Sequence, residues 1–98
     1  VNPTHVAVAL FYKPGMAAPR VVAKGLRKRA LRIRQLAEDA SVPVVENAPL
    51  ARGLYRRTPT GGHISSEFFK AVAVILARLQ REGRRQFGPQ SEPQVAHA

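Results

Sequence analysis

Near its start the chain carries Asn2, Pro3, Thr4 and His5, a run whose chemistry could cut its own backbone. The side-chain amide nitrogen of an asparagine can attack its own main-chain carbonyl, close a succinimide ring and release the next residue as a free amine. Deamidation usually wins instead, because the backbone nitrogen of the next residue attacks the asparagine side chain. Proline has no backbone N–H, so this competing route is closed. Cleavage between Asn2 and Pro3 is the reaction that remains.

The neighbouring residues could assist this reaction. The imidazole of His5 can accept or relay a proton, and Thr4 could hold the turn or the reacting carbonyl. A tight turn that holds Asn2 close to its attacking geometry would supply much of the acceleration, because positioning is worth roughly 7–11 kcal/mol in favourable cases. Asn-Pro is also a common turn dipeptide. These four residues alone therefore do not separate a reactive site from a plain turn.

Other kinds of site chemistry find little support in the sequence. The chain has no cysteine, which excludes a disulfide framework, a thiolate zinc site and a cysteine nucleophile. His5, His63 and His97 have no carboxylate or second histidine at ligand spacing, so we expect no metal site. There is no glycine-rich phosphate loop, nucleophile elbow or pair of carboxylates. We therefore expect no cofactor.

Size and charge limit the function classes further. A chain of 98 residues buries only about 60–65% of its unfolded surface, which suits one modest core and excludes a two-domain enzyme. Sixteen Lys and Arg against six Asp and Glu give a net charge of +10, which favours an anionic lipid or nucleic-acid partner. The few aromatic residues form no stacking platform, and no RNA or DNA motif is present. A basic nucleic-acid-binding domain is therefore a weaker interpretation of the sequence than a self-cleaving one.

Strands alternate with helices along the chain. Alternating or β-branched residues predict strands at 4–12, 19–24 and 42–46. The pattern of residues 26–40 predicts an amphipathic helix with a basic outer face, in which these apolar positions recur at helical spacing: Leu26, Ala30, Ile33, Ala37 and Ala40. Asn47 as cap and Pro49 in the first turn predict a short helix at 50–57, which Gly53 weakens.

The last predicted helix begins at a Ser65 cap and runs to about residue 82. Ile64 and Phe69 are spaced to form a hydrophobic staple across that cap. Its expected buried stripe is Phe69, Val72, Ala73, Leu76 and Leu79. We assign residues 1–82 to one domain, and the composition of residues 83–98 predicts a disordered tail.

This order of elements predicts an α/β fold, a small sandwich with a short mixed central sheet, partly parallel, flanked by helices. Three strands are few for such a sheet. A further strand before Asn2 would complete it, and the chain begins with Val1 rather than Met. We therefore interpret the sequence as a fragment whose first strand is missing.

Five short motifs follow one another along the chain. They are Asn-Pro-Thr-His with the next Val-Ala-Val-Ala-Leu, Val-Val-Ala-Lys-Gly at 21–25, Ala-Leu-Arg-Ile-Arg at 30–34, Val-Pro-Val-Val-Glu-Asn at 42–47, and Pro-Leu-Ala-Arg-Gly-Leu-Tyr at 49–55. Together they resemble the cytosolic domain of the FlhB/YscU family, the substrate-specificity switch proteins of flagellar and virulence type III export machines. The resemblance covers about residues 2–79, and the second and third motifs favour a flagellar system.

The resemblance implies a cytosolic domain tethered to four transmembrane helices at the cytoplasmic face of the bacterial inner membrane. The family cleaves itself once between the Asn and Pro of the motif, and the two pieces stay together in one fold. Carried onto this chain, Asn2 cyclises, its bond to Pro3 breaks, and Thr4 and His5 line the site. Cleavage in the family lets export change from early to late substrates. The implied partners are export substrates, a ruler protein, export-gate proteins and the N-terminal cleavage half.

A second candidate site is a partner surface formed by Pro49, Leu50, Arg52 and Tyr55. The alternative places Leu50 and Leu54 in the core and leaves Arg52 exposed. Two features depart from the family pattern. Residues 27–29 are all basic where acidic or neutral residues are usual, so no family partner surface is carried over to them. The basic helix at 26–40 is most often a solvated charged face, although near a membrane its cations could hold anionic headgroups. Gly53 stands where Ala is more usual. A purely structural adaptor that never cleaves also remains open.

Overall fold

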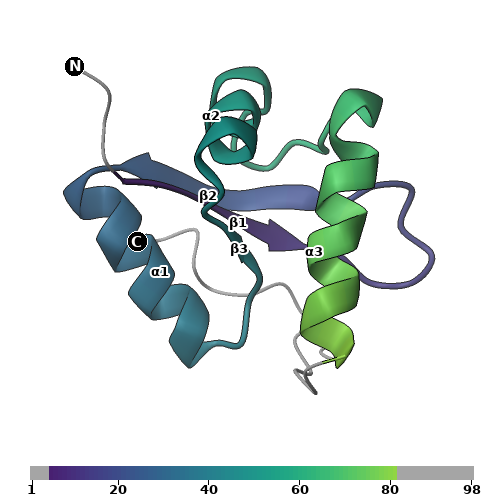
Figure 1. Ribbon diagram of the computed structural model, residues 1–98, viewed down its shortest axis with the longest axis horizontal. Coiled ribbons are helices and arrows are strands. Elements are labelled where there is room, and N and C mark those ends of the chain that lie inside the picture. Colours follow the sequence, from purple (N-terminus) through teal and green to yellow (C-terminus); the bar gives the residue numbers. More distant parts are fainter. Residues whose placement is uncertain (1–4, 82–98) are drawn as a thin grey trace.

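The computed structural model describes residues 5–81 (Figure 1). Asn2, Pro3, Thr4 and the predicted tail at 83–98 lie outside the described residues. The elements follow the predicted order and are β1 (Val6–Phe11), β2 (Arg20–Leu26), α1 (Lys28–Asp39), β3 (Val44–Val45), α2 (Ala48–Arg57), a 3₁₀ turn η1 (Ser66–Phe68) and α3 (Phe69–Arg81). Every element predicted within these bounds is present.

The predicted α/β fold with helices around a small sheet is confirmed, and one detail of the sheet is corrected. The strand order is β2-β1-β3, and both pairings of β1 are antiparallel. The strand–helix–strand succession β2-α1-β3 does bring β2 and β3 into the same direction. However, β1 lies between them, so the expected parallel pairing does not occur among the described strands. Residues 12–19 connect β1 to β2 without another element between them, and consecutive strands of this kind usually pair as antiparallel neighbours.

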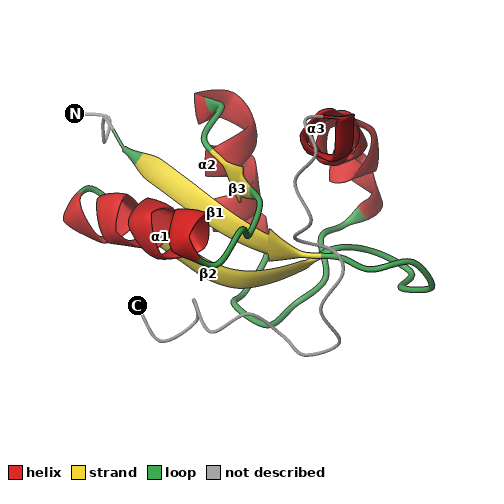
Figure 2. Ribbon diagram, turned by 90° about the horizontal axis from the view of Figure 1, so that it is seen from below, coloured by secondary structure: helices red, strands yellow, loops and turns green. Residues whose placement is uncertain are grey.

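Strand β1 is the centre of the fold because all six of its residues are buried. Side chains alternate along a strand, so β1 supplies both faces of the sheet. Val6, Val8 and Leu10 lie in a core cluster with residues of α2 and α3. Ala7, Ala9 and Phe11 lie in a second cluster with residues of α1. Figure 2 shows the result, with α1 on one face of the sheet and α2 and α3 on the other.

The amphipathic pattern of α1 is confirmed. Ala30, Ile33 and Ala37 are buried against the sheet, while the charged residues of this helix face outward. The end of β2 and the first turn of α1 lie close together, with the side chain of Arg29 against Gly25. A Cβ atom on Gly25 would come within 2.6 Å of Arg29 Cγ. The glycine therefore permits the close approach of α1 to the end of β2.

Polar contacts define both ends of helix α2. The side-chain oxygen of Asn47 accepts a hydrogen bond from the Leu50 N–H at 3.2 Å, which confirms the predicted cap. At the other end, Lys24 Nζ donates to the carbonyl oxygens of Tyr55 at 2.8 Å and Thr58 at 2.9 Å. A cation at this position complements the negative end of the helix dipole. Lys24 thus joins β2 to α2.

The last helix differs from the sequence-based expectation in its register. Ser65 precedes the 3₁₀ turn but makes no side-chain capping hydrogen bond. Phe69 is 41% exposed and Ala73 is exposed, so the expected staple with Ile64 and the places of Phe69 and Ala73 in the buried stripe are wrong. Phe68 packs instead against the core cluster that contains Val72 and Leu76. The 3₁₀ turn shifts the direction of the side chains before α3 begins, because it has fewer residues per turn.

Candidate functional site

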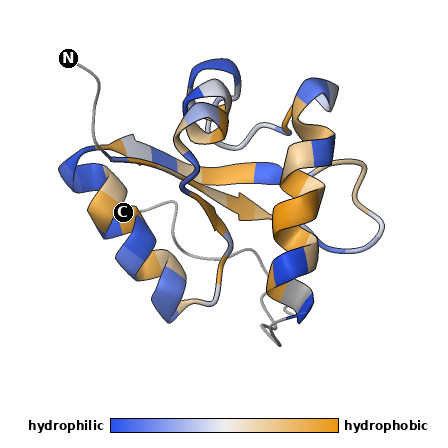
Figure 3. Ribbon diagram, in the orientation of Figure 1, coloured by the Kyte–Doolittle hydropathy of each residue, from blue (hydrophilic) through white to orange (hydrophobic). Residues whose placement is uncertain are grey.

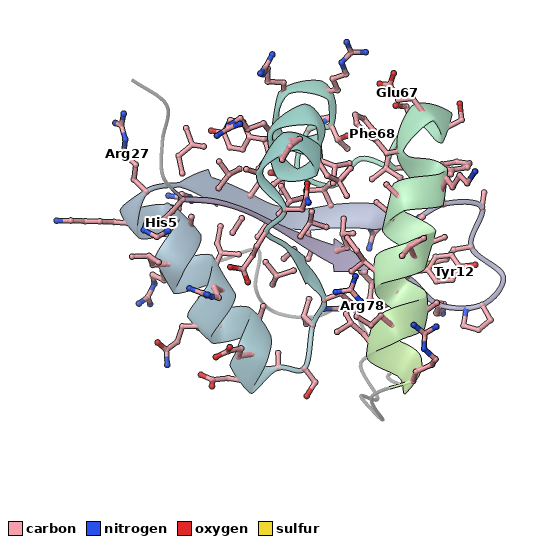
Figure 4. All side chains as sticks on the ribbon, viewed as in Figure 1. His5, Tyr12, Arg27, Glu67, Phe68 and Arg78 are labelled. Carbon is pink, nitrogen blue, oxygen red and sulfur yellow. The ribbon has the colours of Figure 1, made fainter. Side chains whose placement is uncertain are left out.

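His5 is the one residue of the predicted cleavage motif that the structure describes. It is exposed and lies immediately before β1. Its carbonyl oxygen accepts a hydrogen bond from the Arg27 N–H at 2.9 Å, and the next residue, Val6, pairs with Leu26. The last position of the motif is therefore anchored to the junction of β2 and α1. Figure 4 shows the side chains of His5 and Arg27 at the same end of the sheet.

The junction between β2 and α1, beside His5, combines a rare backbone conformation with several positively charged residues. Arg27 has φ 55° and ψ −124°, a conformation that a residue with a Cβ rarely adopts, and it makes no side-chain cap on α1. Lys28 and Arg29 follow in the first turn, which contains no acidic residue. Cations are unfavourable at a helix start because the helix dipole is positive there. The sequence placed these residues on a solvated helix face and missed their position next to His5.

A small hollow of about 60 Å³ lies beside His5. Residues of β1 and α1 line it, and Glu46 closes one side. Arg34 Nε lies 3.2 Å from a Glu46 carboxylate oxygen, with both side chains about half exposed. This pair adds little stability by itself, but it neutralises the acidic group closest to the hollow.

The four residues of the predicted partner surface share α2 but do not form one exposed face. Pro49 is exposed, while Leu50, Arg52 and Tyr55 are half-buried. Arg52 is therefore less exposed than expected, and its Nε is buried without a hydrogen-bond partner among residues 5–81. The ring of Tyr55 lies 4.9 Å from Lys24 Nζ, so it has a structural contact. Leu54 is fully buried and Leu50 packs against the same core, as the alternative interpretation expected.

A groove of about 640 Å³ runs along β3, which is an edge strand of the described sheet. Its α1 side carries the Arg34–Glu46 ion pair. Apolar residues of α3 form the opposite wall, namely Ala71, Val74, Ile75 and Leu79. Leu50 lines this groove, and it is the only member of the predicted partner surface to do so. The sequence did not predict the groove because its walls are distant in the chain.

A second, more apolar hollow of about 390 Å³ lies on the other side of α3. Its lining comes from the loop between β1 and β2 and from α3, and consists of Tyr12, Pro14, Ala17, Pro19, Phe69, Ala73, Leu76 and Ala77. Figure 3 shows α3 as largely hydrophobic along its length. A helix that is apolar on more than one face indicates contacts on more than one side, and this signal was available in the sequence.

Neither a metal centre nor a membrane span is found in the part of the chain that the structure describes. Within residues 5–81, no three His, Cys, Asp or Glu side chains gather closely enough to hold a metal ion. No helix in the same range is long and apolar enough to cross a membrane.

Comparison with known proteins identifies the family. The model of the FlhB HrpN YscU SpaS family matches residues 1–79. The flagellar biosynthetic protein FlhB of Escherichia coli is 45% identical over 98% of this chain, which covers 26% of that protein. The hypersensitivity response secretion protein HrcU of Ralstonia nicotianae is 42% identical over 96% of this chain, again covering 26% of that protein. The chain thus spans about a quarter of the length of these relatives.

The fold agrees with this sequence similarity. The crystal structure of a mutated EscU/SpaS C-terminal domain superimposes with a TM-score of 0.72 at 39% identity, covering 81% of this chain and 99% of that domain. The chain therefore belongs to the FlhB HrpN YscU SpaS family of type III secretion export proteins.

Proposed function

We propose that this chain is the substrate-specificity switch domain of a type III protein export apparatus and that it cleaves itself between Asn2 and Pro3. The observation that carries the proposal is the Asn-Pro-Thr-His run in a member of this family, with its last residue held at the start of β1 by the Arg27 N–H. An intramolecular attack is favoured where the reacting groups are held in place, and the proposal assigns such positioning to the Asn-Pro-Thr-His run.

The proposed reaction balances without a cofactor. The side-chain amide nitrogen of Asn2 attacks the main-chain carbonyl carbon of Asn2, and the carbonyl oxygen becomes negatively charged. The bond between this carbon and Pro3 nitrogen then breaks. The amide loses one proton and Pro3 nitrogen gains one, so the products are a succinimide at Asn2 and a free secondary amine at Pro3. His5, the described residue of the motif, could relay this proton, and water later opens the succinimide.

Docking of export substrates is the second part of the proposal. The apolar hollow between the β1–β2 loop and α3 suits a short apolar segment of a substrate, because Phe69, which lines it, is 41% exposed. Leu50, which lines the groove along β3, and the exposed Pro49 that precedes it in the chain suit an apparatus protein such as a ruler or export-gate protein. We place the domain at the cytoplasmic face of the inner membrane, together with its N-terminal cleavage half.

Intact-mass measurement of the full-length gene product tests the cleavage. We expect a fragment that begins with Pro3 from the wild-type protein and none from the Asn2→Ala variant. Asn47→Ala is the matched control, because it removes an asparagine whose role is to cap α2. A folded wild-type protein that shows no such fragment after prolonged incubation would refute self-cleavage.

A non-cleaving adaptor and a nucleic-acid-binding domain predict different results from those of a self-cleaving switch. For an adaptor that never cleaves, Asn2→Ala would leave the change from early to late export substrates unaltered. For a nucleic-acid-binding domain, the net charge of +10 alone accounts for salt-sensitive binding to any duplex. Only a large preference for one sequence or structure would favour that function.

A further inference from the structure

We propose that the outward side of α1, near its start, docks on an anionic lipid surface. This part of the protein, here called the basic face, consists of Arg27, Lys28, Leu31 and Arg32. It lies outside the cleavage motif, and the inference rests on the proposed placement of the domain at the inner membrane. The partner combines negatively charged phosphate headgroups with an apolar layer beneath them.

The basic face points away from the sheet. Lys28, Leu31 and Arg32 are three and four residues apart, so they share one side of the helix, and Arg27 directly precedes the helix. The buried residues of α1 lie on the opposite side, against β1 and β2. Figure 2 shows no other described element over the outward side of α1. The basic face is therefore open to a partner.

The charge of the basic face is not neutralised by its neighbours on the helix. Arg27, Lys28 and Arg32 are all exposed, and the first turn of α1 contains no acidic residue. The positive end of the helix dipole adds to their charge. The resulting surface attracts a partner that carries negative charge.

Two other arginines of α1 make contacts elsewhere and do not belong to the basic face. The side chain of Arg29 lies against Gly25, and Arg34 Nε lies 3.2 Å from a Glu46 carboxylate oxygen. The charge of the basic face therefore comes from its own three cations.

Leu31 distinguishes a lipid surface from other anionic partners. Its side chain is 42% exposed and lies on the same side of the helix as Lys28 and Arg32. A lipid surface accepts both kinds of group, because phosphates bind the cations while an apolar side chain enters the layer beneath the headgroups. The phosphates of a nucleic acid bind the cations alone, and single strands stack on aromatic side chains, which the basic face lacks. The hollow of about 60 Å³ that Leu31 lines is too small for an organic ligand.

The order of charges along α1 works against helix stability. Cations lie at its start, whereas Glu38 and Asp39 are exposed in its last turn, which contains no basic residue. Both ends are unfavourable with respect to the helix dipole. Local features that oppose folding are typical of functional surfaces. This order also orients the domain, because an anionic surface attracts the start of α1 and repels its end.

Sedimentation with lipid vesicles measures the binding of the 98-residue chain. We expect binding to phosphatidylcholine vesicles that contain about one third phosphatidylglycerol, and none to phosphatidylcholine alone. Each well-placed cation strengthens binding about fivefold. Replacing all three, as Arg27→Gln, Lys28→Gln and Arg32→Gln, should therefore weaken binding about a hundredfold. Leu31→Ser should weaken it about fivefold and leave the binding of duplex DNA unchanged.

The matched control is Lys13→Gln with Lys70→Gln and Arg81→Gln, which removes the same charge from exposed positions. These residues lie in the β1–β2 loop and on α3, at the far side of the molecule from α1 (Figures 1 and 2). Net charge is then equal in the two variants, and only the position of the lost charge differs. We expect the control to lose less than about fivefold in binding.

A fluorescent probe reports which side of the molecule meets the vesicle. The chain has no cysteine, so one introduced cysteine can be labelled selectively. Gln35 is exposed one turn after Leu31 and can be replaced without altering the basic face. An environment-sensitive fluorophore on Gln35→Cys should brighten with anionic vesicles, and one on Lys70→Cys should not.

Equal losses in the basic-face variant and its matched control would overturn the inference, because net charge alone would then be responsible. Equal brightening of the two probes would overturn it as well, and this measurement keeps the basic face intact, so it decides the question even if the triple variant fails to fold. Binding that Leu31→Ser leaves unchanged, with a preference for duplex DNA over vesicles at the same salt, would assign the face to a nucleic acid. Intact mass and membrane fractionation of the full-length product test the proposed self-cleavage and placement separately, so a chain that binds no vesicle would refute this inference alone.

Discussion

Gly53 lies in the middle of α2, and its replacement by alanine brings two opposing effects into one measurement. Alanine is favoured over glycine in a helix interior by about 1 kcal/mol. A Cβ atom at this position, however, would lie 2.9 Å from Cε1 and 3.3 Å from Cζ of Phe68. Phe68 packs against the core beneath α2, so its ring must shift. Overpacking of this kind costs about 1–3 kcal/mol.

We therefore expect Gly53→Ala to leave the free energy of unfolding unchanged or to lower it by up to about 2 kcal/mol, in spite of the better helix propensity. In a Phe68→Leu background the ring atoms are gone, and the same change should stabilise the protein by about 1 kcal/mol. The coupling between the two positions should therefore reach about 1–3 kcal/mol. Urea denaturation of the four variants of this cycle measures it.

Phe69→Leu provides the matched control for Phe68→Leu, because the neighbouring ring is 41% exposed and does not contact Gly53 at this range. We expect Gly53→Ala and Phe69→Leu to be additive within about 0.5 kcal/mol. If Gly53→Ala stabilises the wild-type protein as much as it stabilises the Phe68→Leu variant, the packing explanation for glycine at this position is refuted.

Three further outcomes can be measured on the same protein. Lys24→Met should lower the free energy of unfolding by about 2 kcal/mol, because two charge-assisted bonds to the carbonyls at the end of α2 are lost; a loss below about 0.5 kcal/mol in urea denaturation would contradict this. Thr58→Val should stabilise by about 1 kcal/mol, because the Thr58 hydroxyl is buried without a hydrogen-bond partner among the described residues. Thr58→Ser, which keeps the hydroxyl, should show no such gain in a thermal melt. Phe69→Gln should change stability by less than about 1 kcal/mol because the ring is partly exposed, and should weaken capture of export substrates in a pull-down, whereas Lys70→Gln should not.

The sequence alone determined the local elements and the chemistry of the motif. Residue type is enough to show that proline closes the deamidation route at Asn2. Periodicity placed α1, because Ala30, Ile33 and Ala37 recur at helical spacing. Capping chemistry placed α2, since Asn47 bonds to the Leu50 N–H as expected. These features depend on residues within a few positions of one another, and a linear pattern contains that information.

Contacts between distant segments were decided only by the tertiary structure. Whether Phe68 or Phe69 enters the core depends on the 3₁₀ turn before α3 and on the space above Gly53, which neighbouring residues do not specify. The antiparallel sheet follows from β1 lying between β2 and β3. The contact between Arg27 and His5 likewise arises from the pairing of β1 with β2. Periodicity reports which face of an element is apolar, but packing determines which other element covers it.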